Sequence, residues 1–463
     1  MTEKNISRLK ISLSFLSIFI AAACTSTNNF DLHGTAVKSK IYSSVEEEPF
    51  FSQNCNSFFE EKLSNNIPVV IKKSKYQKNC SLALLIESDE IPDKEKKSGI
   101  EEITLELMKL GTLEYSNLYI SSLEYTDLTK FTSYVHSDFL QYGIVFPKEK
   151  ISAIIPVFAQ TYKKPLLSLE DFEEIVRQKK NNFSDSDKKE QIKVIQKIYE
   201  VLNGTYGCFV PCFYTENSLI TYKDVVNCHA RLLNAGRIKI VASGNFNDDE
   251  VQLLFKSLNE NFGNLKTSAF TKKMTAEKKI AASDFESAKF SFIEPDLKQD
   301  YLFGVYSIPK PLSINYYNYA LCSLFLDDML YNYAKETNNF AEDAGTGTLT
   351  GWNNVGIISF YNVKILNKLN EGIQDFILSN LKIETIKKKL DFYKRIYISS
   401  VMSSELSSSE TVRQMALSLF YSGEAKKYIE RPFIIQHITA EDVERSFAEI
   451  MSAGIVWLNF VNE

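Results

Sequence analysis

The order of strand-like and helix-like segments runs twice through this sequence, and no other feature constrains the fold as strongly. In the first half, β-rich runs at 66–72 and 81–87 precede an amphipathic helical segment at 99–110. In the second half, β-rich runs at 288–293 and 301–308 again precede a helical segment, at 315–334. A unit of about 200 residues that occurs twice predicts two similar cores instead of one large core.

Further segments of both kinds complete each half. The first half adds strand segments at 128–134, 139–146 and 237–242 and helical segments at 151–162, 169–183, 188–202 and 248–262. The second half adds strand segments at 355–366 and 455–460 and helical segments at 371–381, 384–402, 409–421 and 440–451. This order predicts an α+β fold with two similar αβ sandwich domains (ferredoxin-like rolls), each a mixed sheet with helices on one face.

The expected domain boundaries follow from the segments that lack a pattern. Residues 266–283 are rich in Lys, Thr and Ala without apolar periodicity, so they are expected to form a linker. The first domain is then expected at 51–265 and the second at 284–463.

The amino terminus has the features of an export signal. Basic residues precede an apolar stretch from Ile11 to Ala23, which is shorter than the roughly 20 residues that a membrane-spanning helix needs. Small residues then lead directly into Cys24, and this arrangement resembles a bacterial lipoprotein signal, although Leu is commoner than Ala21 at that position. We therefore expect a signal peptide at 1–23, lipidation of Cys24 and a flexible tether over 24–50. Ordinary secretory cleavage near Ala23 is the alternative.

Composition limits the classes of partner. The net charge is −5, so the chain has no basic excess to attract nucleic acid. Apolar residues make up 44% of the sequence, which excludes a disordered chain. No segment after the signal is apolar enough to span a bilayer, so the chain is expected to project from the membrane surface of the bacterial cell envelope.

Export permits disulfides, but the sequence does not determine their pairing. Cys55–Cys80 and Cys208–Cys212 are candidate pairs, and the remaining cysteines are Cys228 and Cys322. Cys208 and Cys212 followed by Cys228-His229 could instead hold zinc, although this spacing is not that of a usual zinc finger. The other histidines, His33, His136 and His437, have no ligand spacing between them.

Several ordered segments resemble the insulinase and mitochondrial processing peptidase family of zinc peptidases, which carry an inverted H-x-x-E-H motif. The resemblance covers about residues 57 to 463. It is carried by LSNNIPVVIKK, SGIEEITLELMKLGT, PLLSLEDFEEIVRQKKNNF, RIKIVASGNFNDDEV, EPDLKQDYLFGVYSIPKP and LDDMLYNYAKETNNFAEDAG. In that family, two histidines and a distal Glu bind zinc, and a Glu within the motif activates the metal-bound water.

All four of these positions differ in this chain. Glu102 and Glu106 stand at the two histidines, Leu105 at the general base and Asn182 at the distal ligand. An alkyl side chain cannot accept a proton, so the resemblance implies a catalytically degenerate member with no catalytic residue and no metal or other cofactor. Glu102 and Glu106 are expected on a solvated helix face with Lys109, and a weak site for a hard cation such as calcium or magnesium is the alternative.

The substrate-contact positions of the family have changed as well. Lys335 and Glu342 stand at the Arg and Tyr of its second domain, and Lys does not reproduce the planar fork of Arg. Thr129 and Lys130 stand at the Asn-Ala beside its substrate-binding strand. The loss is therefore spread over both domains.

Three functions remain open from the sequence. The first is a non-catalytic, membrane-anchored partner subunit that forms half of a peptide-enclosing chamber with an active peptidase chain or a second copy. The second is a stand-alone lipoprotein that binds unfolded peptides or acts as a scaffold, with strand addition at 128–134 as one mode of binding. The third is a working zinc peptidase, which the changed motif disfavours.

Overall fold

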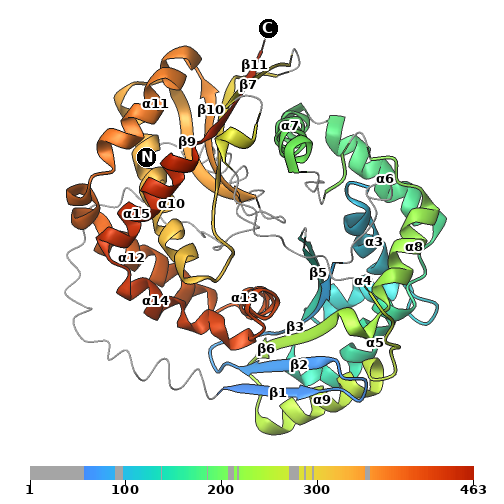
Figure 1. The fold of residues 1–463 in the computed structure, drawn as a ribbon. Coiled ribbons are helices and arrows are strands. Elements are labelled where there is room, and N and C mark those ends of the chain that lie inside the picture. Colours follow the sequence, from blue (N-terminus) through green and yellow to red (C-terminus); the bar gives the residue numbers. More distant parts are fainter. Residues whose placement is uncertain are drawn as a thin grey trace.

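The computed structural model shows two β-sheets with helices packed against them (Figure 1). It describes residues 57–88, 97–136, 138–184, 186–206, 213–215, 218–270, 281–285, 288–294, 297–349 and 355–462. Sheet 1 has six strands in the order β1-β2-β6-β3-β5-β4, and sheet 2 has five strands in the order β7-β11-β8-β10-β9. Below, the first half means the described residues up to 270, and the second half those from 281 onward. The prediction of an α+β fold with two mixed sheets is confirmed.

The elements lie close to the segments expected from the sequence. The first half contains β1 (Phe58–Lys62), β2 (Pro68–Lys73), β3 (Cys80–Glu87), α3 (Ile100–Met108), α4 (Asn117–Thr126), β4 (Lys130–Val135), β5 (Phe139–Phe146), α5 (Ile151–Lys163), α6 (Leu169–Ser184), α7 (Ser186–Tyr206), α8 (Tyr222–Leu232), β6 (Ile238–Gly244) and α9 (Asp248–Phe262). The second half contains β7 (Lys289–Ile293), β8 (Tyr301–Ser307), α10 (Ile314–Tyr331), the π-helical turn η5 (Asn332–Thr337), β9 (Ala341–Leu349), β10 (Val355–Val363), α11 (Leu366–Asn380), α12 (Ile383–Ser404), α13 (Ser408–Ser422), α14 (Arg431–His437), α15 (Ala440–Ala453) and β11 (Val456–Val461). Short 3-10 turns occur at Lys148–Lys150, Ala235–Arg237, Ala282–Asp284 and Ala425–Glu430.

Both sheets are mixed because each contains one parallel pair among antiparallel ones. β2 pairs parallel with β6 in sheet 1, and β11 pairs parallel with β7 in sheet 2. The central strands are apolar on both faces: in β3, Leu82, Leu84 and Ile86 point to one side while Ala83 and Leu85 point to the other. A strand with this pattern must be covered on both faces.

One face of each sheet is covered by helices of the same half. On sheet 1 these are α3, α5, α6, α8 and α9, whose apolar residues share one core with the strands. On sheet 2 they are α10, α11, α12, α14 and α15. This part of each half is the predicted sandwich with helices on one face.

The opposite face of each sheet is covered by a helix from the other half. Helix α13, of the second half, lies across β3 and β6 of sheet 1 (Figure 1). Its Met415 and Ala416 pack against Val70, Leu85 and Val241. Helix α7, of the first half, packs in the same way on sheet 2, where its apolar residues meet β8, β10 and β11. The two halves therefore exchange one helix each, which the sequence did not predict.

Several predicted features lie outside the described residues. These are the signal peptide, Cys24, the tether and residues 271–280 of the expected linker. Within the described part of the chain, no helix is both long and apolar enough to cross a membrane.

The cysteines that the structure describes are all buried free thiols. They are Cys80, Cys228 and Cys322. Cys80 packs directly against Gly244, and a Cβ at Gly244 would overlap the sulfur of Cys80. The candidate pair Cys55–Cys80 is therefore not formed in this structure, because Cys80 is free and 1% exposed. Cys55, Cys208 and Cys212 lie outside the described residues.

Candidate functional site

Helix α3 carries the positions at which the resemblance places the peptidase motif. It begins after Gly99, whose φ of 76° lies in the left-handed region that favours glycine. A Cβ at Gly99 would lie 2.7 Å from the carbonyl carbon of Phe213 and would overlap the backbone of Tyr214. Only glycine therefore lets the segment around Tyr214 pass directly over the start of α3.

Leu105 occupies the position of the general base and lies in the hydrophobic core. Its side chain is fully buried, and it packs in the same core as Ile103 and Leu107 of this helix. A leucine in that environment has no group that can accept or donate a proton. The arrangement therefore provides no general base at this position.

Glu102 and Glu106 point toward helix α6 and share one cation. The ammonium of Lys179 donates to Glu102 Oε1 at 2.6 Å and to Glu106 Oε1 at 2.7 Å. The second oxygen of Glu102 accepts from the backbone N–H of Tyr214 at 2.7 Å. These three side chains are only partly exposed, with fractions of 19% for Lys179, 26% for Glu102 and 32% for Glu106. A lysine on α6 thus lies between the two carboxylates that stand where the family has imidazoles.

The charges of this cluster compensate each other. Burial disfavours the charged form of Lys179, but Glu102 and Glu106 outweigh it, so the pKa of Lys179 is raised. Burial also dominates at Lys109 and lowers its pKa, despite the attraction of Glu106. The ammonium of Lys109 donates to Ser133 Oγ on β4 at 3.1 Å.

Two expectations for this helix face need correction. The face was expected to be solvated and to pair Glu106 with Lys109, but Lys179 is the cation that bridges Glu106, and Lys109 reaches β4. A local helix pattern cannot reveal Lys179, because it lies far away in the sequence. The alternative of a weak calcium or magnesium site fits poorly as well, since three of the four carboxylate oxygens already accept hydrogen bonds.

The remaining positions of the first half are spread over α6 and β4. Asn182 lies on α6, one turn after Lys179, and its side chain is outside the description. Thr129 is fully buried and donates from its backbone N–H to Leu123 at 3.1 Å. Lys130 is exposed and begins β4, the edge strand of sheet 1.

In the second half, Lys335 and Glu342 lie at the junction of α10 and β9. Lys335 belongs to the π-helical turn η5, and its ammonium lies 4.8 Å from the centre of the Tyr331 ring. Glu342 is the second residue of β9 and is exposed. Neither provides the guanidinium or the phenol that the family uses at these places.

Zinc does not fit the side chains found at the motif. Zinc sites in proteins use imidazole and thiolate with few carboxylates, whereas this cluster offers two carboxylates already bridged by an ammonium. Among the residues that the structure describes, no group of three or more His, Cys, Asp or Glu side chains could hold a metal ion.

The histidines lie elsewhere and have structural contacts. His229 on α8 is buried, its Nε2 lies 2.8 Å from the carbonyl of Tyr162, and burial lowers its pKa. His136 is buried beside β5, and His437 Nδ1 lies 2.8 Å from a carbonyl of its own helix. His33 lies outside the described residues.

Cys228, which precedes His229, is a buried thiol. Burial raises its pKa to about 12, so the thiolate that zinc requires is disfavoured. The alternative of a zinc site with Cys208 and Cys212 stays a prediction, because those two cysteines lie outside the described residues.

We expect the substitution Lys179→Met to lower the free energy of unfolding by about 1–2 kcal/mol, because two carboxylates would lose their shared cation. Since the pKa of Lys179 is raised, its contribution is present below the ordinary lysine pKa of about 10.4 and is lost as the pH rises through the folded-state value. The difference between wild type and variant should therefore shrink above about pH 10.5. Urea unfolding titrations at several pH values measure this difference in the free energy of unfolding. The control is Lys180→Met, at the exposed neighbouring lysine, and an equal loss in both variants would contradict the bridge.

Comparison with known families gives two adjacent matches. The sequence model described as Insulinase (Peptidase family M16) matches residues 68–208, and the one described as Peptidase M16 inactive domain matches residues 219–377. No curated protein sequence matches the chain.

Solved structures share the fold over nearly the whole chain at low sequence identity. A protease from Helicobacter pylori has a TM-score of 0.71 and 15% identity, and the match covers 87% of this chain and 99% of that chain. A peptidase M16 inactive domain from Pseudomonas fluorescens has a TM-score of 0.70 and 15% identity, covering 88% and 98%. The periplasmic protease PqqL from Escherichia coli has a TM-score of 0.67 and 13% identity, covering 95% of this chain and 48% of that chain. The two sequence matches are to two domains of one family and together span most of residues 68–377, so this chain belongs to the insulinase family, peptidase family M16.

Proposed function

We propose that the chain is a non-catalytic, membrane-anchored member of this family that acts as a partner subunit. In this role it contributes half of a chamber that encloses unfolded peptides, and an active peptidase chain contributes the other half. The chain itself takes part by its fold and its inner surface, without hydrolysing peptide bonds.

The observation that carries the proposal is the position of Lys179 between Glu102 and Glu106. A positive charge held at this point opposes the approach of a second, divalent cation, and the two carboxylates are already engaged. Leu105 supports the same conclusion because it is buried in the core at the place of the general base.

The size of relatives supports the role of half an assembly. The chain covers 48% of PqqL and 45% of a FusC protease that was solved as an E83A mutant in complex with Arabidopsis ferredoxin. Two chains of the present length would equal one such protease. If this chain assembles as the longer proteases are built, a second chain would supply the half of the structure that PqqL and FusC carry in the same polypeptide.

Export and anchoring rest on the amino-terminal sequence. The apolar stretch that ends at Ala23 and the cysteine that follows support a lipid anchor at Cys24 in the bacterial cell envelope. The description of PqqL as periplasmic agrees with an exported location.

Fractionation and co-purification test the proposal together. The full-length protein should sediment with membranes, and Cys24→Ala should release the folded protein into the soluble fraction, because the acyl chains would be absent. Extraction in mild detergent should then co-purify a second chain of the same family that has an intact H-x-x-E-H motif. A monomer without a family partner after cross-linking in intact cells would contradict the subunit role.

The edge position of β4 favours one further candidate function. β4 pairs only with β5 among the described strands, so an extended peptide could add to its other side. A stand-alone peptide-binding lipoprotein would use this edge without a partner. Binding of unstructured peptides below millimolar concentration by the isolated chain would favour this function over the subunit role.

A further inference from the structure

Lys72 is a charged residue in the interior of the molecule, at the point where the two halves meet. It lies on β2 of sheet 1, and none of its surface is exposed. Its side chain belongs to the face of the sheet that α13 covers, since Val70 two residues before it packs against that helix. An unpaired ammonium in such a place would cost several kcal/mol, so its partners decide the stability of this contact.

The polar partners that the structure gives for the Lys72 ammonium come from the second half, while the Phe58 ring of β1 lies 6.0 Å from it. It forms an ion pair with Glu405, which follows the end of α12. It also donates to the hydroxyl of Tyr428 at 2.7 Å, and it lies 5.3 Å from the centre of the Tyr428 ring. Burial and the nearby Glu405 raise the pKa of Tyr428 well above its usual value, so this hydroxyl stays neutral.

Gln77 adds a second link beside Lys72. Its side-chain amide donates to the backbone carbonyl of Glu405 at 3.0 Å and to Thr411 Oγ1 at 2.9 Å. Its own oxygen accepts from Ser243 Oγ on β6 at 2.8 Å. The side chain of Gln77 thus joins a strand of sheet 1 to the beginning of α13.

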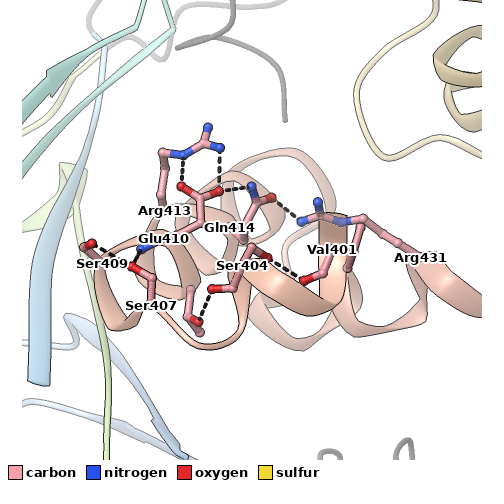
Figure 2. Close-up of polar contacts among 9 residues, drawn as sticks. Val401, Ser404, Ser407, Ser409, Glu410, Arg413, Gln414 and Arg431 are labelled. Atoms are coloured by element: carbon pink, nitrogen blue, oxygen red, sulfur yellow. Dashed lines mark hydrogen bonds and ion pairs between the residues drawn. The ribbon is translucent and has the colours of Figure 1, made fainter. Parts of the chain in front are cut away.

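The start of α13 is held in place by charges of its own half (Figure 2). The guanidinium of Arg413 donates two hydrogen bonds, of 2.8 and 2.6 Å, to the carboxylate of Glu410. Gln414 donates to the same carboxylate at 2.5 Å. Gln414 accepts in turn from Arg431, whose guanidinium lies 5.5 Å from the centre of the Tyr428 ring. The phenol that meets Lys72 is therefore part of a network of polar side chains of the second half.

We propose that the Lys72 network is a lock that fixes the position of α13 on sheet 1. Breaking this lock destabilises both halves together, because the exchanged helices α7 and α13 make the two halves unfold as one unit. A shift of α13 along the sheet would leave the Lys72 ammonium buried without Glu405 and Tyr428. Apolar packing alone tolerates such shifts, whereas a buried ion pair penalises every position except one. The exchange of α7 for α13 then transmits the loss of this contact to both sheets.

The tryptophans provide a probe of this coupling in the full-length chain. The sequence has two tryptophans: Trp457 is buried in β11 of sheet 2, and Trp352, which also follows residue 281 in the sequence, lies outside the described residues. Tryptophan fluorescence therefore follows the unfolding of the second half, while far-UV circular dichroism follows both. Lys72 itself lies in the first half.

The test is denaturant unfolding of wild type, Lys72→Met and Lys73→Met by both probes. The lock predicts one coincident transition for each protein, with the unfolding equilibrium constant of Lys72→Met raised about 100-fold or more in both signals. Lys73→Met is the matched control, because its ion pair with Asp248 lies at the surface within the first half, and it should change the constant less than about fivefold.

A milder variant keeps the proposal testable if Lys72→Met does not fold. Tyr428→Phe removes only the hydroxyl that accepts from Lys72, and it should raise the unfolding constant about 10-fold in both signals. Two separated transitions, or a fluorescence transition that Lys72→Met and Tyr428→Phe leave unchanged, would overturn the proposal.

Discussion

Replacing Gly99 with alanine should lower the free energy of unfolding by about 3 kcal/mol or more. The left-handed φ of 76° alone costs a residue with a Cβ about 1–2 kcal/mol. The new methyl group would also overlap the backbone of Tyr214, which cannot move aside as a flexible side chain could. The displaced segment would take the Tyr214 N–H away from Glu102 and loosen the cluster around Lys179.

Gly423 provides the control that separates the two costs. It ends α13 with a similar φ of 80°, but a Cβ there would meet no atom within 4 Å. Gly423→Ala should therefore cost about 1–2 kcal/mol, from the backbone conformation alone. Urea unfolding measures both variants, and equal losses would mean that the close approach of Tyr214 to α3 does not exist.

Placing a carboxylate between α13 and sheet 1 should lower the free energy of unfolding by about 4 kcal/mol or more. Ala416 is fully buried in the cluster that α13 shares with the sheet. In the variant Ala416→Asp, an unpaired charge would either stay buried among leucine and valine side chains or push the helix away. The first outcome leaves a charge without a partner in the core, and the second exposes the apolar second face of sheet 1.

The same change at an exposed position of α13 is the matched control. Ser409 lies at the surface in the first turn, where a negative charge is favoured by the helix dipole. Ser409→Asp should change the stability by less than about 0.5 kcal/mol. If Ala416→Asp unfolded at the same urea concentration as Ser409→Asp, α13 would not cover sheet 1 in solution.

The sequence predicted most elements because their patterns are local. The runs at 81–87 and 139–146 are long and apolar, and they coincide with β3 and β5. The strands missed were those with weak patterns. β1 (Phe58–Lys62) carries charged, exposed residues at the sheet edge, and β9 (Ala341–Leu349) contains glycines and an Asp that depress strand propensity.

The exchange of helices between the halves could not be predicted in the same way. The apolar runs in β2 and β3 indicate strands buried on both faces, but they do not say which helix covers the second face. The apolar residues of α13 fit any neighbouring surface of suitable size. Lys72 gave no signal either, because a lysine at the end of an apolar strand is usually solvated.

The candidate site was predicted in part. The residues at the motif positions follow from the sequence, and the structure places Glu102 and Glu106 side by side on α3. The cation between them did not follow, since Lys179 lies 77 residues from Glu102 and no helical period connects them. One hint was present: Lys179 precedes Asn182 by one turn of α6, so it lies near the place of the distal ligand.

Metal content and peptide hydrolysis of the purified full-length protein test the central claim most directly. A relative with an intact H-x-x-E-H motif, purified in the same way, serves as the positive control. The proposed function predicts less than one zinc ion per protein molecule. It also predicts that the protein does not cleave an unfolded protein substrate in any chelator-sensitive way. Stoichiometric zinc together with chelator-sensitive cleavage would contradict it, because an ammonium at Lys179 and a zinc ion cannot occupy the same pair of carboxylates.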